Sequence, residues 1–433
     1  MIKTRFQIFK ILFDHEIKLI RIDYLLSDNN LFHDYNNDEI RFIHKITFGV
    51  LRHKSKIDYY ISKYYKGNFK KLLIKHKIIL RIGVYQLFYM DSTPNYAAVN
   101  TTVDLCKKID KNKVNLVNAI MRKISQNSDK KDVFSVLSIE YCHPKWLIDK
   151  WSKQWSDKKL IEFLKWNNKE PQIWFRINTL KTSKNEIHNF LKMKNIDFIQ
   201  NDILKEYFTV GSTQKIIKSE LMKNGLISVQ NPASGLVVKL LNPKKNEIIF
   251  DGCAAPGGKS TYISELTAQN TQIHSYDNDE NRIKVIESNL ERLNINNIKC
   301  YKADLTTDSI PKYKLGLIDV PCSGTGVISK RIDIKWRRSM ENIYEMINIQ
   351  SKIIKNVSKY LDNEGILVYS TCSVEEEENW AIIDNFLNCN KNFRLDKADK
   401  FIPKEYVDNN GCLSIFPPIH NLDGIFAARL IKK

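Results

Sequence analysis

The sequence predicts a multidomain α and α/β protein, with an N-terminal all-α domain, a small α/β linker unit and a C-terminal doubly wound α/β domain. Three observations support this prediction. The chain of 433 residues is long enough for two or three domains. Apolar residues in its first third recur at helical spacing. From residue 231 onward, short apolar runs alternate with helical segments, as in a parallel sheet with crossover helices.

The predicted domain limits follow from these changes of pattern. Residues 1–140 are expected to form the all-α domain. Residues 141–230 are expected to contain connecting helices and then a small mixed α/β unit, which starts near Trp174. Residues 231–433 are expected to form the doubly wound domain, and the apolar run 424–430 is predicted to be an edge strand of its sheet.

The strongest local signal in the third region is a strand, a glycine-rich turn and a helix start. An apolar strand at 247–250 runs into Asp-Gly-Cys-Ala-Ala-Pro-Gly-Gly-Lys at 251–259. Glycines allow a tight turn close to a ligand, and a helix N-terminus offers free N–H groups. The next strand ends in Asp277, 19 residues after Gly258, near the spacing at which a carboxylate binds ribose hydroxyls. The pattern predicts a cofactor that contains a nucleoside.

The same loop narrows the choice of cofactor. It lacks the G-x-G-x-x-G pattern of NAD sites. The phosphate-binding pattern G-x-x-x-x-G-K-[ST] also fails, because the glycine that it requires would fall at position 253, which is a cysteine. S-adenosylmethionine is the remaining common nucleoside cofactor on such a sheet, and it is the cofactor we expect.

Two later strands of the predicted sheet are each followed by a cysteine. The run that starts at Leu315 leads to Cys322, and the run that starts at Ile366 leads to Cys372. Because the carboxyl ends of the strands in an open α/β sheet border the ligand crevice, both thiols are expected at that rim. The sequence has no C-x-x-C pair, so neither a disulfide framework nor a metal site is expected. The other cysteines, 106, 142, 253, 300, 389 and 412, are expected to be small packed residues.

These motifs resemble those of the RNA cytosine-5 methyltransferases of the NOL1/NOP2/Sun family. The resemblance rests on residues 251–259, on Asp-Val-Pro-Cys-Ser-Gly-Thr-Gly at 319–326, and on Ser-Thr-Cys-Ser at 370–373, which is followed by Glu378 and Asn379. It implies a Rossmann-like domain that transfers a methyl group from S-adenosylmethionine to carbon 5 of cytosine. Three segments of the first third, 48–52, 81–87 and 117–122, are similar to NusB-like RNA-binding domains. A NusB-like domain ahead of this catalytic domain is typical of the bacterial 16S ribosomal RNA cytosine-5 methyltransferases.

The resemblance also suggests roles for individual residues. It assigns the attack on carbon 6 to Cys372 and the release of the product to Cys322, an order that spacing alone leaves open because DNA cytosine-5 methyltransferases use a Pro-Cys nucleophile. Asp319 is expected to hydrogen-bond the base, although capping of the following turn is an alternative. Lys259 is a candidate for lowering the pKa of the attacking thiol. The predicted cofactor-binding residues are Cys253, Ala254, Ala255, Pro256, Gly257, Gly258, Lys259, Asp277, Asp304 and Asp319.

Composition is consistent with a nucleic-acid substrate. The formal net charge is +19. The segment from Arg52 to Arg81 carries ten basic residues and one acid, which makes it a candidate RNA-binding cluster. Its interleaved aromatic side chains are expected to pack rather than stack on bases, and for Trp336 packing and stacking on RNA are equally open.

Neither a membrane span nor a secretory leader is evident in the sequence. We therefore expect a cytoplasmic, monomeric enzyme that uses no metal and methylates 16S ribosomal RNA, either as naked RNA or in a partly assembled small subunit. A related enzyme that acts on transfer RNA or another RNA is one alternative. A non-catalytic RNA-binding or antitermination protein is another, which the cysteine pair disfavours.

Overall fold

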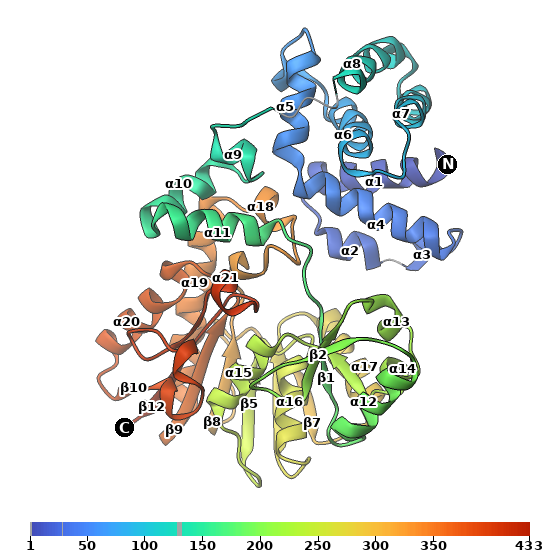
Figure 1. Ribbon diagram of the computed structural model, residues 1–433. Helices are drawn as coiled ribbons and strands as arrows, with labels where there is room; N and C mark the ends of the chain where they lie inside the picture. The colour runs from blue at the N-terminus through green and yellow to red at the C-terminus, as the bar shows by residue number, and fades with distance from the viewer. Residues whose placement is uncertain (1, 28, 128–131) are drawn as a thin grey trace. The chain divides into compact units, whose positions relative to one another are not determined.

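The computed structural model describes residues 2–27, 29–127 and 132–433, which form two compact units. Unit 1 consists of residues 1–170 and 328–337, and unit 2 of residues 171–327 and 338–433 (Figure 1). Unit 1 therefore contains a short segment from late in the chain in addition to the helices of the first 170 residues. The predicted domain limits near residues 140 and 230 stay a prediction.

Among its described residues, unit 1 contains helices and no strands. Its central helix is α6, and every residue from 78 to 86 of this helix is buried, including the polar side chains of Arg81 and Gln86. Helices α1, α4, α5, α7 and α8 pack around it. The helices are α1 (Ile2–Lys18), α2 (Ile22–Ser27), α3 (Asn29–Phe32), α4 (Asn37–Arg52), α5 (Lys54–Tyr64), η1 (Phe69–Lys71), α6 (Ile74–Tyr89), α7 (Asn95–Ile109), η2 (Lys111–Lys113), α8 (Val114–Gln126), α9 (Leu137–Glu140), α10 (Lys145–Gln154), α11 (Asp157–Asn167) and α18 (Ile334–Arg337).

Unit 2 begins with a small antiparallel sheet in the order β2-β3-β1-β4. Its strands are β1 (Trp174–Ile177), β2 (Phe198–Gln200), β3 (Tyr207–Val210) and β4 (Ile227–Val229). Three helices accompany it, α12 (Lys184–Met193), α13 (Thr213–Ile217) and α14 (Glu220–Lys223). Phe175 and Phe208 stack at the centre of the core that these elements share. The predicted small α/β unit is therefore present.

The rest of unit 2 is built on an eight-stranded mixed sheet with the order β10-β12-β9-β8-β5-β6-β7, in which β11 pairs with β12. The five strands from β5 to β9 are parallel, and β12 runs antiparallel to β9. The strands are β5 (Ile248–Gly252), β6 (Gln272–Asp277), β7 (Ile298–Lys302), β8 (Tyr313–Asp319), β9 (Leu361–Thr371), β10 (Phe393–Asp396), β11 (Leu413–Ile415) and β12 (Ile425–Lys432). The chain order reverses between β5 and β8, and such a switch point is where open α/β sheets bind ligands.

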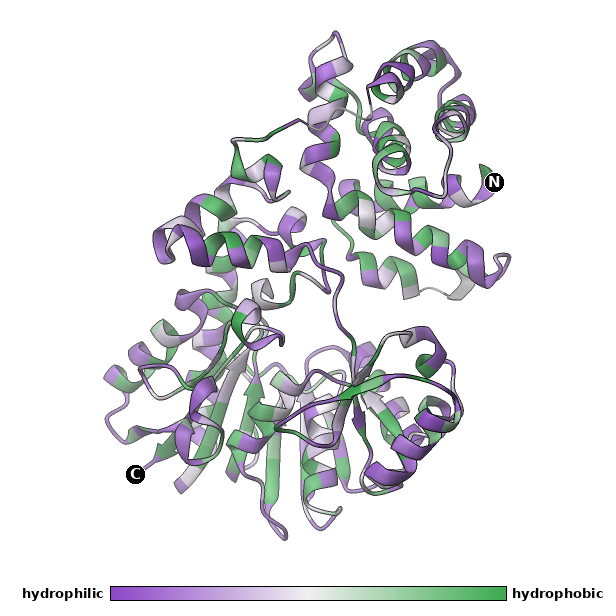
Figure 2. Ribbon diagram, in the orientation of Figure 1, coloured by the Kyte–Doolittle hydropathy of each residue, from purple (hydrophilic) through white to green (hydrophobic). Residues whose placement is uncertain are grey.

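Helices cover both faces of this sheet. Successive strand residues point to opposite faces, so Ile249 belongs to the core under α15, α16 and α17, and Phe250 to the core under α19 and α20. Figure 2 shows the resulting concentration of hydrophobic residues along the strands. The helical elements are α15 (Pro232–Leu241), α16 (Gly258–Leu266), α17 (Glu280–Leu293), η3 (Thr325–Val327), α19 (Met340–Val357), η4 (Ser358–Tyr360), η5 (Glu376–Glu378), α20 (Trp380–Cys389), η6 (Ala398–Lys400), η7 (Lys404–Tyr406) and α21 (Pro417–His420).

The prediction of an edge strand near the C-terminus is wrong. β12 lies between β9 and β10, and residues 425–430 are all buried. The physical reason is composition: a strand that is apolar at consecutive positions is stabilised by cover on both faces and neighbours on both sides. The edge position is taken by β10, which carries the exposed Arg394.

Candidate active site

The glycine-rich turn connects β5 to α16 at the switch point of the sheet. Gly257 has a φ of +89°, a left-handed conformation that side chains disfavour, and a Cβ placed there would come 2.9 Å from Ile286 Cγ2. The chain therefore needs glycine at this position to enter α16. Among the predicted cofactor-binding residues of the turn, Ala254, Ala255 and Gly257 are buried, Cys253, Gly258 and Lys259 are half-buried, and Pro256 is exposed.

Asp277 ends β6 directly beside this turn. Its Oδ2 accepts a hydrogen bond from the Ala255 N–H at 3.1 Å, and its Oδ1 accepts one from Arg282 Nη1 at 3.1 Å. Arg282 also donates to the Ala255 carbonyl at 2.9 Å. The side chain of Asp277 is only 1% exposed. The carboxylate thus braces the turn, in addition to lying where the sequence predicts a ribose ligand.

A cavity of about 270 Å³ opens between the turn and α19. Three predicted carboxylates, Asp277, Asp304 and Asp319, line it. Asp304 Oδ1 accepts hydrogen bonds from the Thr306 N–H and hydroxyl, and these bonds lower the pKa of Asp304 below its ordinary value. The remaining lining residues are Cys253, Asn278, Arg282, Ala303, Leu305, Thr306, Pro321, Ile349 and Ile353. The cavity therefore combines acidic groups on the sheet side with an apolar wall from α19.

Asp319 ends β8 and has two partners. Lys259 Nζ pairs with its Oδ2, and Ser370 Oγ donates to its Oδ1 at 2.6 Å. Its side chain remains 36% exposed, so it is reachable from the cavity. The sequence predicts that the positive charge of Lys259 lowers the pKa of the attacking thiol, whereas in the structure this charge is paired with the carboxylate of Asp319.

The two predicted cysteines meet. The Sγ atoms of Cys322 and Cys372 lie 3.3 Å apart, within hydrogen-bond distance, although the residues are 50 positions apart in the sequence. The pKa of Cys322 is raised well above its ordinary value, first by the hydrogen bond to Cys372 and then by burial and by the nearby carboxylates Glu378 and Asp319. Cys322 therefore keeps its proton near neutral pH.

Several residues that shape this site were not predicted. Arg282 and Ser370 hold the two central carboxylates, and Ile349 and Ile353 supply the apolar wall. A signal existed only for Ser370, because it stands within the Ser-Thr-Cys-Ser motif. The isoleucines of α19 have no local signal, since their helical spacing is the same as that of any core helix.

Most cysteines outside the pair are packed as expected. Cys106, Cys142 and Cys412 are buried, and Cys253 and Cys300 are half-buried. Burial raises the pKa of Cys300 to about 11. For Cys389 the expectation is wrong, because this residue lies at the last position of α20 and is exposed. The last turn of α20 presents it away from the apolar face that packs on the sheet.

The basic cluster at 52–81 carries less free charge than the sequence suggests. Arg81 is buried, and the aromatic Tyr60 is packed with Phe88 and Phe134. Acids from outside the segment neutralise much of it, because the helical fold brings them alongside. The ion pairs are Lys54 and Arg81 with Glu16, Lys56 with Glu140, Lys63 with Asp132, Lys75 with Asp110, and Arg81 with Asp58 from within the segment.

Trp336 packs within unit 1. Its indole N–H donates to the Leu51 carbonyl at 2.7 Å, and the neighbouring Lys335 donates to Asn168 Oδ1 at 2.9 Å. Lys335 is fully buried, and burial lowers its pKa to about 7. Of the two readings of Trp336, these contacts favour packing over stacking on RNA.

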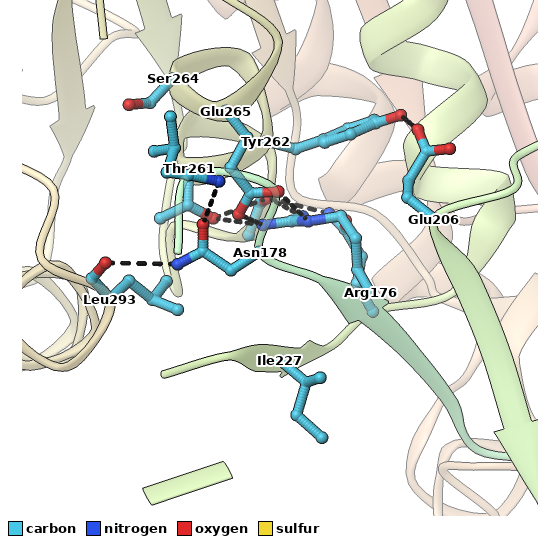
Figure 3. A network of polar contacts seen from close by, with 12 residues as sticks. Arg176, Asn178, Glu206, Ile227, Thr261, Tyr262, Ser264, Glu265 and Leu293 are labelled. Atoms are coloured by element: carbon cyan, nitrogen blue, oxygen red, sulfur yellow. Dashed lines mark hydrogen bonds and ion pairs between the residues drawn. The ribbon is translucent and has the colours of Figure 1, made fainter. Parts of the chain in front are cut away.

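A buried polar network joins the small sheet to the glycine-rich turn within unit 2 (Figure 3). Arg176 on β1 is fully buried, and its guanidinium points at Glu265 on α16, with which it forms a two-pronged ion pair at 2.7 and 2.9 Å. Its Nη1 also donates to the Gly258 carbonyl at 3.0 Å, and its Nη2 to Thr261 at 3.0 Å. The small sheet thereby fixes the start of α16, where the glycine-rich turn ends.

Replacing Arg176 with methionine is expected to lower the free energy of unfolding by about 3–5 kcal/mol, because it leaves the Glu265 carboxylate buried without its partner. Changing Glu265 to leucine in the same chain should restore much of the loss. Urea denaturation followed by circular dichroism measures both variants. Lys223→Met, which breaks the exposed pair with Glu220, is the matched control and should change little. Equal losses in the single and double variants would contradict an energetic coupling between Arg176 and Glu265.

None of the helices among the described residues combines the length and apolar character needed to cross a bilayer.

Three families of known proteins match successive parts of the chain. Residues 2–126 match the NusB family, residues 143–216 match the ferredoxin-like domain of RsmF/B-like methyltransferases, and residues 238–431 match the family described as 16S rRNA methyltransferase RsmB/F. These three regions follow the order of the helical part, the small sheet and the large sheet.

Individual relatives match across nearly the whole chain. The probable ribosomal RNA small subunit methyltransferase B of Synechocystis is 31% identical over 413 residues, which covers 92% of this chain and 93% of the relative. The crystal structure of PH0851 covers 100% of this chain and 99% of its own, with a TM-score of 0.84 and 24% identity. NSun6 from Pyrococcus horikoshii, solved with SFG, covers 67% of this chain and 98% of its own, with a TM-score of 0.61 and 21% identity. The two solved structures establish the fold. The 31% identity to the Synechocystis protein, over more than nine-tenths of both chains, shows the family: this chain belongs to the RsmB/F family of 16S rRNA methyltransferases.

Proposed function

We propose that the protein methylates carbon 5 of a cytosine in 16S ribosomal RNA with S-adenosylmethionine as the methyl donor. The observation that carries this proposal is the pair of thiols 3.3 Å apart beside the cavity that contains Asp319. Carbon 5 of cytosine is a weak nucleophile, and addition of a thiolate to carbon 6 makes it reactive. A methyltransferase that modified a nitrogen or an oxygen would have no use for two such cysteines.

The residues around the cavity fit S-adenosylmethionine. The left-handed Gly257 adds no side chain to the turn. Asp277 and Asp304 would hold the ribose hydroxyls and the amino group of the adenine base, and Ile349 and Ile353 would supply an apolar wall for the adenine ring. The Synechocystis relative is named a methyltransferase, which supports the same cofactor class. The bound cofactor would supply an electrophilic methyl group.

In the proposed mechanism, Cys372 attacks carbon 6 of the cytosine as a thiolate. Cys322, whose pKa is raised, keeps its proton and donates it in the hydrogen bond to Cys372, which stabilises a thiolate on that partner. Asp319 accepts a hydrogen bond from the amino group of the base. It also hydrogen-bonds N3 and gives general acid assistance there while charge develops on the ring. Lys259 and Ser370 hold Asp319 in place for this contact.

The covalent adduct must then be resolved. After methylation, carbon 5 loses its proton and the bond between Cys372 and carbon 6 breaks, which restores the aromatic ring. Cys322 would lie next to this bond. Once Cys322 has released its own proton to solvent, its thiolate takes the proton from carbon 5, the electrons of that C–H bond form the double bond between carbons 5 and 6, and Cys372 leaves as a thiolate; the raised pKa of Cys322 makes it a strong base for this step. The order of action, Cys372 first and Cys322 second, is the one that the family resemblance implies, and the raised pKa of Cys322 supports it.

Bisulfite sequencing of ribosomal RNA tests the proposed function. RNA from cells with and without the protein is compared, and the purified protein is then given 16S RNA, either free or in small-subunit particles. One cytosine that resists conversion only when the protein is present is the expected result. Protection of a transfer RNA cytosine instead would favour the alternative substrate, and no protected cytosine in any RNA would overturn the proposal.

Replacing Asp277 with alanine is expected to weaken S-adenosylmethionine binding by about 1.5–3 kcal/mol, the usual range for a lost hydrogen bond to a charged group. The dissociation constant should therefore rise by about 10- to 150-fold. Isothermal titration calorimetry measures this directly. Asp279→Ala, which removes the cap of α17 but lies outside the cavity, is the control. Unchanged affinity in a folded Asp277→Ala protein would remove this residue from the cofactor site.

A further inference from the structure

A single buried carboxylate connects the two loops that carry the cysteines. Glu378, in η5, is fully buried. Its Oε1 accepts hydrogen bonds from the Ser323 N–H at 2.8 Å and from Gln350 Nε2 at 2.9 Å. Its Oε2 accepts the hydroxyls of Ser323 and Ser373, the latter at 2.6 Å.

The placement of these partners relates Glu378 to both thiols. Ser323 directly follows Cys322, and Ser373 directly follows Cys372. Gln350 extends the connection, because its side chain also donates to the Pro321 carbonyl at 2.9 Å, on the other side of Cys322. One carboxylate therefore holds the backbone next to each of the two cysteines, whose sulfur atoms lie 3.3 Å apart.

Burial of a carboxylate is energetically unfavourable, and a neutral side chain could also hold the two loops together. The four hydrogen-bond donors described above for Glu378 are neutral groups, and burial of a charge without a cation is unfavourable compared with an apolar or amide contact. The negative charge does have an effect on the neighbouring thiol, since it contributes to the raised pKa of Cys322. Both the geometry and the charge of Glu378 thus act on the cysteine pair.

We propose that Glu378 is a positioning residue for the two-cysteine reaction, which holds Cys322 against Cys372 so that Cys322 can resolve the covalent adduct. This inference rests on the proposed covalent function. It assigns to Glu378 no contact with the base or the cofactor. Its influence passes through Ser323 and Ser373 to the sulfur atoms.

The first test measures thiol chemistry without substrate, so it stands even if the proposed function fails. The alkylation rate of Cys322 by iodoacetamide is followed against pH by peptide mass spectrometry in the full-length protein. Glu378→Gln keeps a side chain of the same shape and removes the charge, so the alkylation profile of Cys322 should move to lower pH. The exposed Glu376→Gln, in the same short helix, is the matched control and should leave the profile unchanged. An unshifted profile in a folded Glu378→Gln protein would overturn the inference.

The second test uses RNA and separates attack from release. In Glu378→Gln, the covalent protein–RNA complex should still form, but its decay should slow by about tenfold or more. This slowing is smaller than that expected when the acid–base group itself is removed, because Cys322 is still present. A merely structural role would lower both steps together by reducing the amount of folded enzyme, and it would leave the ratio of complex to product unchanged. That unchanged ratio would contradict the inference. Absence of any covalent complex in wild type and in Cys322→Ala would instead contradict the proposed function.

Discussion

Cys372→Ala is expected to lose all detectable methylation and to form no covalent complex with RNA. The reason is that carbon 5 of cytosine becomes a nucleophile only after a thiolate adds to carbon 6, and Cys372 is the thiol to which the proposed mechanism assigns this attack. Transfer of a labelled methyl group to 16S RNA measures the first effect. Denaturing gel electrophoresis measures the second.

Cys322→Ala is expected to behave differently. Attack and methyl transfer should survive, whereas resolution of the adduct should fail because the neighbouring base is absent. A protein–RNA complex that resists denaturant should therefore accumulate, as a shifted gel band that ribonuclease removes. Cys389→Ala replaces an exposed cysteine outside the pair and should match wild type in both assays. Trapping by Cys372→Ala and none by Cys322→Ala would reverse the assignment and make the Pro-Cys residue the nucleophile.

Asp319→Asn is expected to lower the single-turnover rate of methyl transfer by about 10²–10⁴-fold, the usual contribution of a positioned acid–base group. The variant keeps one oxygen for the 2.6 Å hydrogen bond from Ser370 but loses the ion pair with Lys259. Rapid-quench assays at saturating cofactor measure the rate, and calorimetry of cofactor binding separates a loss of chemistry from a loss of affinity.

Ser370→Ala tests the position of Asp319 without removing its carboxylate. It removes one of the two contacts that hold the carboxylate and leaves the carboxylate itself, so the rate should fall by about tenfold, the equivalent of one hydrogen bond. A normal rate in Asp319→Asn together with a lower unfolding temperature would assign this residue to capping of the following turn and remove it from the reaction.

The sequence by itself determined the class of fold and the short motifs that make up the candidate site. The three regions, the glycine-rich turn and the strands that end at Asp277 and Asp319 are all local features. Strand periodicity and glycine chemistry operate over a few residues, so they can be read without knowledge of distant contacts. The resemblance carried by residues 251–259, 319–326 and 370–373 likewise depends on short motifs, and family membership follows the same features.

Only the tertiary structure decided which groups meet, because pairing between distant segments leaves no periodic trace in a sequence. The neutralisation of the basic cluster comes from acids that lie far away along the chain, as in the pairing of Lys63 with Asp132. The interior position of β12 depends on which strands close the sheet. Lys259 was predicted to act on a thiol, but the switch point between β5 and β8 places it beside Asp319. Glu378 is the clearest case, because its partners are up to 55 residues away. A run of four glutamates at 375–378 indicates a solvated surface, whereas the fold buries two of them, Glu375 and Glu378, and places Glu378 between the two cysteine loops.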